Sequence, residues 1–134
     1  MTQIWERLFI GGLTDAERLK KGNPNGIDSV ISLCEQCITP KRHGVNYVHI
    51  PIEDESPLPA GQFDRIMDSI SENIRWGKVL LHCGVGISRA PSLAAAYMAV
   101  VGYKGLDAAI EEIRQLRSII NPSMILFKSI RRHL

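Results

Sequence analysis

The chain has 134 residues, of which 45% are hydrophobic, and 16 basic residues nearly balance 14 acidic ones for a formal net charge of +2. This length and composition predict a single domain, residues 1–134, with an ordinary hydrophobic core. The balanced charge argues against a nucleic-acid-binding protein. No apolar run approaches about eighteen residues and the first residues lack a signal-peptide pattern, so we expect no membrane span and no signal peptide.

The predicted elements alternate between helix and strand. Thr14-Asp15-Ala16-Glu17 has the pattern of a capping box, which predicts a short helix that ends at residues 22–26. Residues 45–52 alternate as a strand does, and residues 78–81 form a buried strand that precedes a helix at 91–101 with proline at its start. Three further helices are predicted by helical spacing of apolar residues: Phe63, Ile66, Met67, Ile70 and Ile74; Leu106, Ala109, Ile110, Ile113 and Leu116; and Ile125, Leu126, Ile130 and Leu134. We therefore expect an α/β fold with a central mixed, mostly parallel sheet flanked by helices.

The most informative segment is residues 82–91, His-Cys-Gly-Val-Gly-Ile-Ser-Arg-Ala-Pro, between the buried strand and the helix. A short Gly-containing loop in this place turns its backbone N–H groups inward over the positive end of a helix, which makes a concave anion site. Arg89 can bind two oxygens of a phosphate, and the same field holds Cys83 as a thiolate. A nucleophile beneath a cradle for a tetrahedral anion predicts attack on phosphorus.

The His-Cys-x5-Arg pattern, with Ser88 before the arginine, resembles the cysteine-dependent protein phosphatases, and the small size is similar to their dual-specificity branch. Weaker similarities cover residues 4–12, 26–33, 50–54 and 121–124, so the resemblance extends over nearly the whole chain. It implies a cysteine phosphatase-like fold. It also implies hydrolysis of phosphotyrosine, phosphoserine and phosphothreonine in proteins through a cysteinyl-phosphate intermediate.

The resemblance, together with the chemistry of the loop, gives each residue a role. Cys83 is the expected nucleophile, and Arg89 is expected to stabilise the charge of the transition state. Ser88 is expected to donate its hydroxyl to the sulfur, to cap the following helix, or to do both. His82 is expected to order the loop and favour the thiolate. The phosphate-binding residues are Gly84, Val85, Gly86, Ile87, Ser88 and Arg89.

An acidic segment, residues 53–55, precedes the loop and is followed by the proline-containing residues 56–59. Asp54 matches the position of the family's general acid, which protonates the leaving oxygen and then activates water. Glu53 and Glu55 are substitutes for this role, and a solvated acidic turn without catalytic function is the simpler interpretation.

Two of the three cysteines, Cys34 and Cys37, have the spacing of half a zinc site, but there is no second pair, so we expect no metal. Some proteins of the resembled family keep a second cysteine near the nucleophile. By this resemblance Cys34 is a candidate redox partner that forms a disulfide with oxidised Cys83, and an ordinary buried thiol is the alternative.

The loop residues 85–87 are neutral, which favours a phosphoprotein substrate over an inositol lipid. Two alternatives remain open: a phosphatase for a non-protein phosphate, such as an RNA 5′-triphosphate or an inositol phosphate, and a phosphate-binding pseudoenzyme. No cofactor is expected, because no nucleotide motif or metal-ligand set occurs. A nucleophilic cysteine must stay reduced, so we expect a cytoplasmic protein, and we expect a monomer that binds neither nucleic acid nor membranes.

Overall fold

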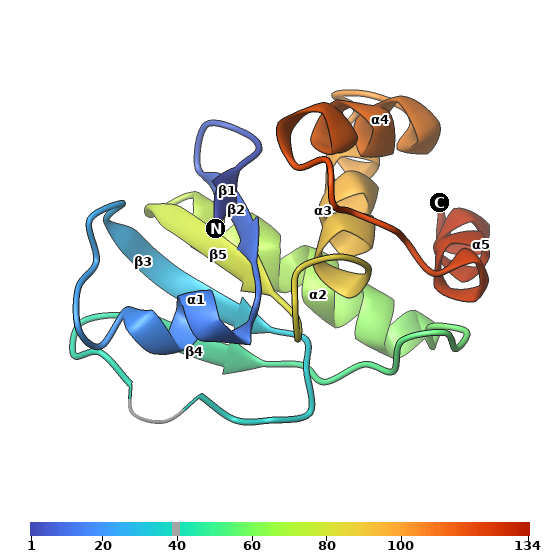
Figure 1. The fold of residues 1–134 in the computed structure, drawn as a ribbon. Helices are drawn as coiled ribbons and strands as arrows, with labels where there is room; N and C mark the ends of the chain where they lie inside the picture. Colours follow the sequence, from blue (N-terminus) through green and yellow to red (C-terminus); the bar gives the residue numbers. More distant parts are fainter. Residues whose placement is uncertain (39–40) are drawn as a thin grey trace.

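The computed structural model describes residues 1–38 and 41–134, and it places a five-stranded sheet between two layers of helix (Figure 1). The strands are β1 (Thr2–Gln3), β2 (Leu8–Gly11), β3 (Ile27–Ser32), β4 (Asn46–His49) and β5 (Lys78–His82). The helices are α1 (Leu13–Arg18), α2 (Ala60–Ile74), α3 (Arg89–Val100), α4 (Leu106–Leu116) and α5 (Met124–His133). The strand order is β1-β2-β5-β3-β4, and only β1 runs antiparallel to its neighbour. The predicted mixed, mostly parallel sheet is confirmed.

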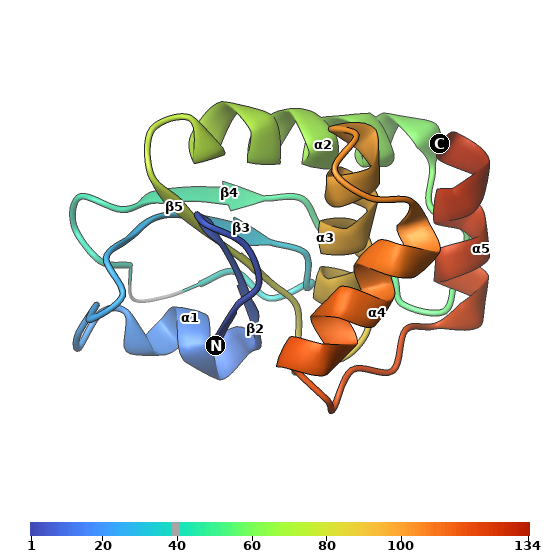
Figure 2. The same cartoon turned by 90° about the horizontal axis from the view of Figure 1, so that it is seen from above.

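The helices cover the two faces of the sheet unequally. Helix α1 lies alone on one face, and α2 to α5 lie on the other (Figure 2). Successive side chains of a strand point to opposite faces, so Phe9 and Leu80 pack in the small cluster with α1, whereas Leu8, Ile10 and Leu81 join the large cluster. No helix in the described ranges combines the length and the apolar character needed to cross a bilayer.

Strand β5 occupies the centre of the sheet, between β2 and β3. Its last residue, His82, pairs with Gly11 on one side and with Ser32 on the other. The carboxyl ends of the parallel strands therefore meet at one edge, where open α/β sheets bind their ligands. The segment after β5 emerges at this edge and continues into α3.

Two predicted element starts differ from the structure. Helix α1 begins at Leu13 with Gly12 as its N-cap, so the capping box predicted at Thr14 is wrong. Asp15 accepts instead from the N–H of Gly12 at 3.0 Å. Helix α3 begins at Arg89, so Pro91 is its third residue. In the first turn of a helix an N–H has no partner within the helix, so the N–H that proline lacks costs no hydrogen bond there.

Candidate active site

The loop at the end of β5, residues 83–89, is held from outside through its carbonyl groups, and we call it the phosphate loop. Four of its carbonyl oxygens accept hydrogen bonds from groups outside the loop. Gly84 O accepts from Leu13 N (2.8 Å), and Ile87 O accepts from Asn121 N (2.8 Å). Val85 O accepts from Arg117 Nη2 (3.3 Å), and Gly86 O accepts from Arg117 Nε (3.0 Å). In a trans peptide the N–H points opposite to the preceding C=O. The N–H groups of residues 85–88 are therefore directed to the inside of the loop.

These inward N–H groups belong to the segment between Cys83 and the first turn of α3. Within the described ranges, the N–H groups of residues 84–89 donate to no protein acceptor. The Cys83 side chain is buried, with 2% of its surface exposed, and its Sγ accepts from the N–H of Ala90 at 3.4 Å in the first turn of α3. Free N–H donors at a helix start are the groups that bind an anion in such a loop.

Two glycines allow the phosphate loop to touch the end of β2 directly. Gly86 has φ +71°, and a Cβ on it would lie 2.7 Å from the carbonyl carbon of Gly11. A Cβ on Gly12 would lie 2.8 Å from the carbonyl oxygen of Gly84. Side chains at these positions would push the loop outward. The sequence analysis assigned no role to Gly11-Gly12, although a glycine pair that ends a strand is a signal for close backbone approach.

Arg117, which follows α4, is a residue that the sequence analysis missed. Its guanidinium donates to the carbonyl oxygens of Val85 and Gly86 and, through Nη1, to Thr2 Oγ1 at 2.9 Å. One planar cation thus holds two consecutive peptide units of the phosphate loop and ties them to β1. The only signal in the sequence is an arginine shortly before the Asn121-Pro122 turn.

His82 is fully buried beneath the loop. Its Nδ1 lies 3.2 Å from the carbonyl oxygen of Cys83, which can only accept, so Nδ1 carries the proton and donates. Nε2 then accepts from the hydroxyl of Ser32 at 2.6 Å. Burial lowers the pKa of His82 and outweighs the hydrogen bond to Cys83, which raises it. The imidazole is therefore a neutral support for the loop, and Ser32, also missed in the sequence, fixes its orientation.

Ser88 forms neither of the two contacts that were expected of its side chain. Its hydroxyl donates to Asp54 Oδ1 at 2.8 Å and accepts from the N–H of Ser123 at 2.8 Å. It makes no side-chain cap to α3, and its single proton is engaged by the carboxylate instead of the sulfur. The expected cap is wrong for a physical reason: the turn before α5 positions the hydroxyl toward Asp54.

Arg89 is the first residue of α3 and is half-buried. Its Nη1 donates to the carbonyl oxygen of Ile52 at 3.1 Å, and its Nη2 lies 3.5 Å from the place of a Cβ on Gly84. The guanidinium therefore lies beside the phosphate loop and contacts the chain that leads to Asp54. Its remaining N–H groups can bind anion oxygens.

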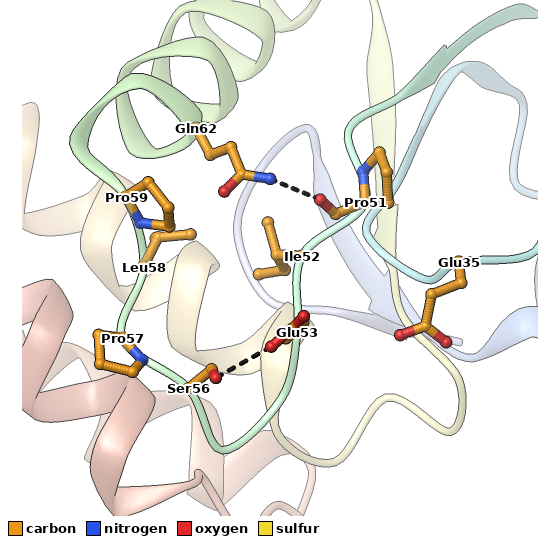
Figure 3. A pocket seen from close by; sticks show the side chains of 9 residues that line it. All are labelled: Glu35, Pro51, Ile52, Glu53, Ser56, Pro57, Leu58, Pro59 and Gln62. Carbon is orange, nitrogen blue, oxygen red and sulfur yellow. Dashed lines mark hydrogen bonds between the residues drawn. The ribbon is translucent and has the colours of Figure 1, made fainter.

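The segment that carries Asp54, residues 51–59, is called the acid loop. It is attached mainly at its two ends: Pro51 O accepts from Gln62 at 2.8 Å, and Leu58 N donates to Ser129 Oγ at 2.7 Å. The acid loop bends around a cavity of about 400 Å³ (Figure 3). Glu53 lines this cavity and accepts from Ser56 at 3.0 Å, whereas Asp54 faces the other side toward Ser88. Of the three acids, Asp54 alone has a hydrogen bond to the phosphate loop among the contacts of the described residues.

The other two cysteines lie outside the phosphate loop. Cys34 is buried, and burial raises the pKa of its thiol. The positive charge of Arg89 lowers this pKa, and Cys83 raises it, so that the net direction is upward. Cys34 and Cys83 follow the ends of the paired strands β3 and β5. Cys37 is exposed, and its Sγ lies 3.5 Å from Nδ1 of His49. No three potential metal ligands gather anywhere in residues 1–38 and 41–134.

A cysteine at the base of an N–H cradle, between a central parallel strand and a helix that begins with arginine, defines the class of cysteine-dependent phosphatase folds. Residues 8–133 match the family model described as dual specificity phosphatase, catalytic domain, and the chain belongs to this family.

Similar proteins agree with this assignment. Dual specificity protein phosphatase 1 of Mus musculus is 31% identical over 123 residues, which cover 90% of this chain and 34% of that protein. This chain thus spans about a third of that relative's length. The crystal structure of DUSP15 has a TM-score of 0.83 and 28% identity and covers 99% of this chain and 83% of its own. The crystal structure of human DUSP28 has the same fold, with a TM-score of 0.87 and 18% identity. The match covers 99% of this chain and 94% of the DUSP28 chain.

Proposed function

We propose that this chain is a metal-independent phosphatase that removes phosphate from tyrosine, serine and threonine residues of proteins. The observation that carries the proposal is the phosphate loop that follows Cys83, whose carbonyls are held outward and whose inward N–H groups have no protein acceptor in the described ranges. Such a cradle fits the three non-bridging oxygens of a phosphoryl group in the ground state and in the transition state. Membership of the dual-specificity phosphatase family supports the same conclusion.

In the first step the Cys83 thiolate attacks phosphorus, and the bond to the leaving oxygen of the substrate breaks. Arg89 and the inward N–H groups bind the phosphoryl oxygens, while protonated Asp54 gives its proton to the leaving oxygen. The product is a cysteinyl-phosphate and a free hydroxyl on the protein substrate. The hydrogen bond from Ser88 to Asp54 supports a positioning role for this serine, since it holds the carboxyl group beside the phosphate loop.

In the second step a water molecule attacks the cysteinyl-phosphate. Asp54, now a carboxylate, takes the proton of this water, and the Cys83 thiolate leaves as inorganic phosphate forms. The buried sulfur is stabilised as a leaving group by the N–H of Ala90 and by the start of α3. No group other than water is consumed, so we propose that the enzyme needs no cofactor.

The substrate class is supported by the neutral rim of the phosphate loop. Val85 is 66% exposed at this rim, and Ile87 is also uncharged, so no cation of residues 85–87 faces a polyphosphate or a multiply phosphorylated inositol. A phosphorylated side chain carries a single phosphate, which Arg89 and the N–H groups neutralise. A phosphatase for RNA 5′-triphosphates or inositol phosphates, and a phosphate-binding pseudoenzyme, are the alternatives that the experiment below distinguishes.

We propose further that Cys34 protects the nucleophile from irreversible oxidation. Peroxide oxidises the Cys83 thiolate to a sulfenic acid; the Cys34 thiol then attacks that sulfur, a disulfide forms and water leaves. The step is supported by the pairing of β3 with β5, in which Leu33 N donates to the carbonyl oxygen of His82 at 2.9 Å, so that Cys34 and Cys83 follow neighbouring strand ends. Peptide mapping without reductant after peroxide treatment tests it, and the absence of a Cys34–Cys83 linked peptide would reject it.

A nucleophilic cysteine must stay reduced to act, so we propose a cytoplasmic location. All of the residues to which we give roles lie in one chain, which supports a monomeric enzyme.

The function is tested by measuring phosphate release from matched phosphotyrosine, phosphothreonine and phosphoserine peptides, with EDTA and reductant present. We expect release from all three and none from Cys83→Ser, whereas Cys37→Ser, which alters an exposed cysteine, retains full activity. Release from RNA 5′-triphosphates or inositol phosphates alone would support the first alternative. Phosphate or vanadate binding without turnover of any substrate would support the pseudoenzyme.

A further inference from the structure

Helices α4 and α5 enclose an apolar cavity of about 340 Å³ on the surface beside the active site. Ile110 of α4 and Phe127 of α5 line it, together with Met124, whose side chain is 70% exposed. An exposed methionine next to a concave apolar surface is typical of a binding site, because a large apolar side chain otherwise gains by burial. We call this cavity the α4–α5 groove.

The rim of the α4–α5 groove is positively charged. Arg114, Lys128 and Arg131 line it, and none of the residues described as lining it is acidic. Arg131 pairs with Asp107 at 2.6 Å and Arg114 with Glu111 at 3.3 Å, whereas Lys128 has no carboxylate partner within the described ranges. Helix α5 has no acidic residue along its whole length. Lys128 therefore carries the uncompensated charge of the rim, and the groove complements a ligand that has an apolar side chain with negative charge beside it.

The α4–α5 groove adjoins the active site across the Asn121–Met124 turn. A second cavity, of about 370 Å³, is lined by Asp54 and Ser88 at one end. Asn121, Pro122 and Met124 line both cavities. A chain bound with its phosphorylated residue in the phosphate loop can thus pass the Asn121–Met124 turn and reach the groove.

We propose that the α4–α5 groove docks the substrate protein, by binding an apolar residue flanked by acidic residues in the same chain as the phosphorylated residue. This inference rests on the proposed function, since the occupant is the substrate itself. A concave site between two helices fits a side chain inserted from a peptide better than the flat surface of a membrane, so we assign a peptide as the occupant.

The test uses peptides and one charge reversal. Fluorescence anisotropy measures binding of an unphosphorylated peptide in which leucine is flanked by glutamates, and of two controls with lysines for the glutamates or serine for the leucine. We expect the Glu-Leu peptide to bind most tightly, and Lys128→Glu to weaken its binding about fivefold. Lys20→Glu, an equal charge change at an exposed lysine after α1, should leave binding unchanged.

The same variants are compared in phosphate release from phosphotyrosine peptides that carry the Glu-Leu segment at increasing distances on either side. We expect one spacing to raise kcat/KM about fivefold in the wild type and not in Lys128→Glu, with hydrolysis of p-nitrophenyl phosphate equal in both. The proposal would be overturned if the three peptides bound equally or if the two charge reversals had equal effects. It would also be overturned if the protein bound only phosphatidylserine vesicles and Lys128→Glu weakened that binding. Failure of the proposed function has a different signature, which is binding of the Glu-Leu peptide without release of phosphate from any substrate.

Discussion

The phosphate loop and the acid loop meet at the hydrogen bond between Ser88 and Asp54, but the molecule holds them differently. Each of the four carbonyls of residues 84–87 has a partner outside the phosphate loop. The acid loop is attached at Pro51, Ile52 and Leu58, and residues 53–55 between these points are exposed.

The difference corresponds to the two chemical tasks that we propose for these loops. An anion site must present its donors in fixed directions, because reorganising them during the reaction would raise the barrier. A general acid must reach different leaving groups and later a water molecule, and a loop anchored at its ends permits this adjustment. Glu55, with φ +53°, lies in this exposed middle part and is the one described non-glycine residue with a positive φ.

The largest effect is expected where the rigid loop itself is disturbed. Gly86→Ala places a Cβ 2.7 Å from the backbone of Gly11 at a positive φ, so the loop must move outward. We expect kcat/KM to fall on the order of 100-fold and the free energy of unfolding to fall by about 2–4 kcal/mol. Steady-state kinetics and urea unfolding measure these quantities.

Gly26→Ala is the matched control, since Gly26 has φ +68° but nothing within 4 Å of its Cβ position. It should cost about 1–2 kcal/mol of stability from backbone strain and leave kcat/KM unchanged. Equal kinetic effects of the two substitutions would mean that the contact between the phosphate loop and β2 is not required.

The next effect concerns the acid loop. Asp54→Asn removes the proton donor, and we expect kcat for an alkyl phosphate to fall on the order of 100-fold. The loss for p-nitrophenyl phosphate should stay below about tenfold, because this leaving group needs little protonation. Glu53→Gln and Glu55→Gln should change both rates less than about threefold, because among the described residues neither has a hydrogen bond to the phosphate loop. Equal losses for both substrates in Asp54→Asn would remove Asp54 as the general acid.

A smaller effect is expected from the support behind the phosphate loop. Arg117→Gln removes the guanidinium that holds the carbonyls of Val85 and Gly86, and we expect kcat/KM and the affinity for orthovanadate each to fall about tenfold. Arg7 also binds two carbonyl oxygens, those of Ile74 and Arg75, but at the far end of the sheet. Arg7→Gln should therefore leave both quantities unchanged, and a wild-type vanadate affinity in Arg117→Gln would contradict the support role.

The smallest effect is a pH dependence of stability. The pKa of His82 is lowered by burial, so the unfolded chain binds a proton more readily than the folded protein. Stability is therefore complete above the ordinary histidine pKa of about 6.5 and falls as the pH drops through and below that value. Thermal unfolding between roughly pH 7.5 and pH 5.5 should show this loss, and His82→Gln should reduce its slope. An unchanged slope would mean that other groups dominate the titration.

The fold was predictable because its signals are local and strong. Helical spacing of apolar residues identified α2, α4 and α5, and the apolar run before Cys83 identified β5. The start of α1 was not predictable, because Gly12 serves as the cap for a tertiary reason: the carbonyl of Gly84 leaves no room for a Cβ there. Local propensity alone therefore pointed to Thr14 as the N-cap of this helix.

The candidate site was predictable where one segment contains the chemistry, as in residues 82–89. The groups that orient this segment were not, because they come from distant parts of the chain. Arg117, Ser32 and the N–H of Asn121 reach the site only through the packing of helices and strands. For the same reason the partner of the Ser88 hydroxyl could not be read from its neighbours, since the turn at Ser123 decides it.

The partners of the phosphate-loop carbonyls also couple the nucleophile to folding. Leu13 lies near the start of the chain, and Arg117 and Asn121 lie shortly before its last helix. Contacts between residues so far apart in sequence close long loops, and this closure costs conformational entropy. The cradle around Cys83 is therefore completed only when both ends of the domain have docked on the central strand. A nascent or partly unfolded chain therefore lacks the finished cradle in which we place the proposed nucleophile.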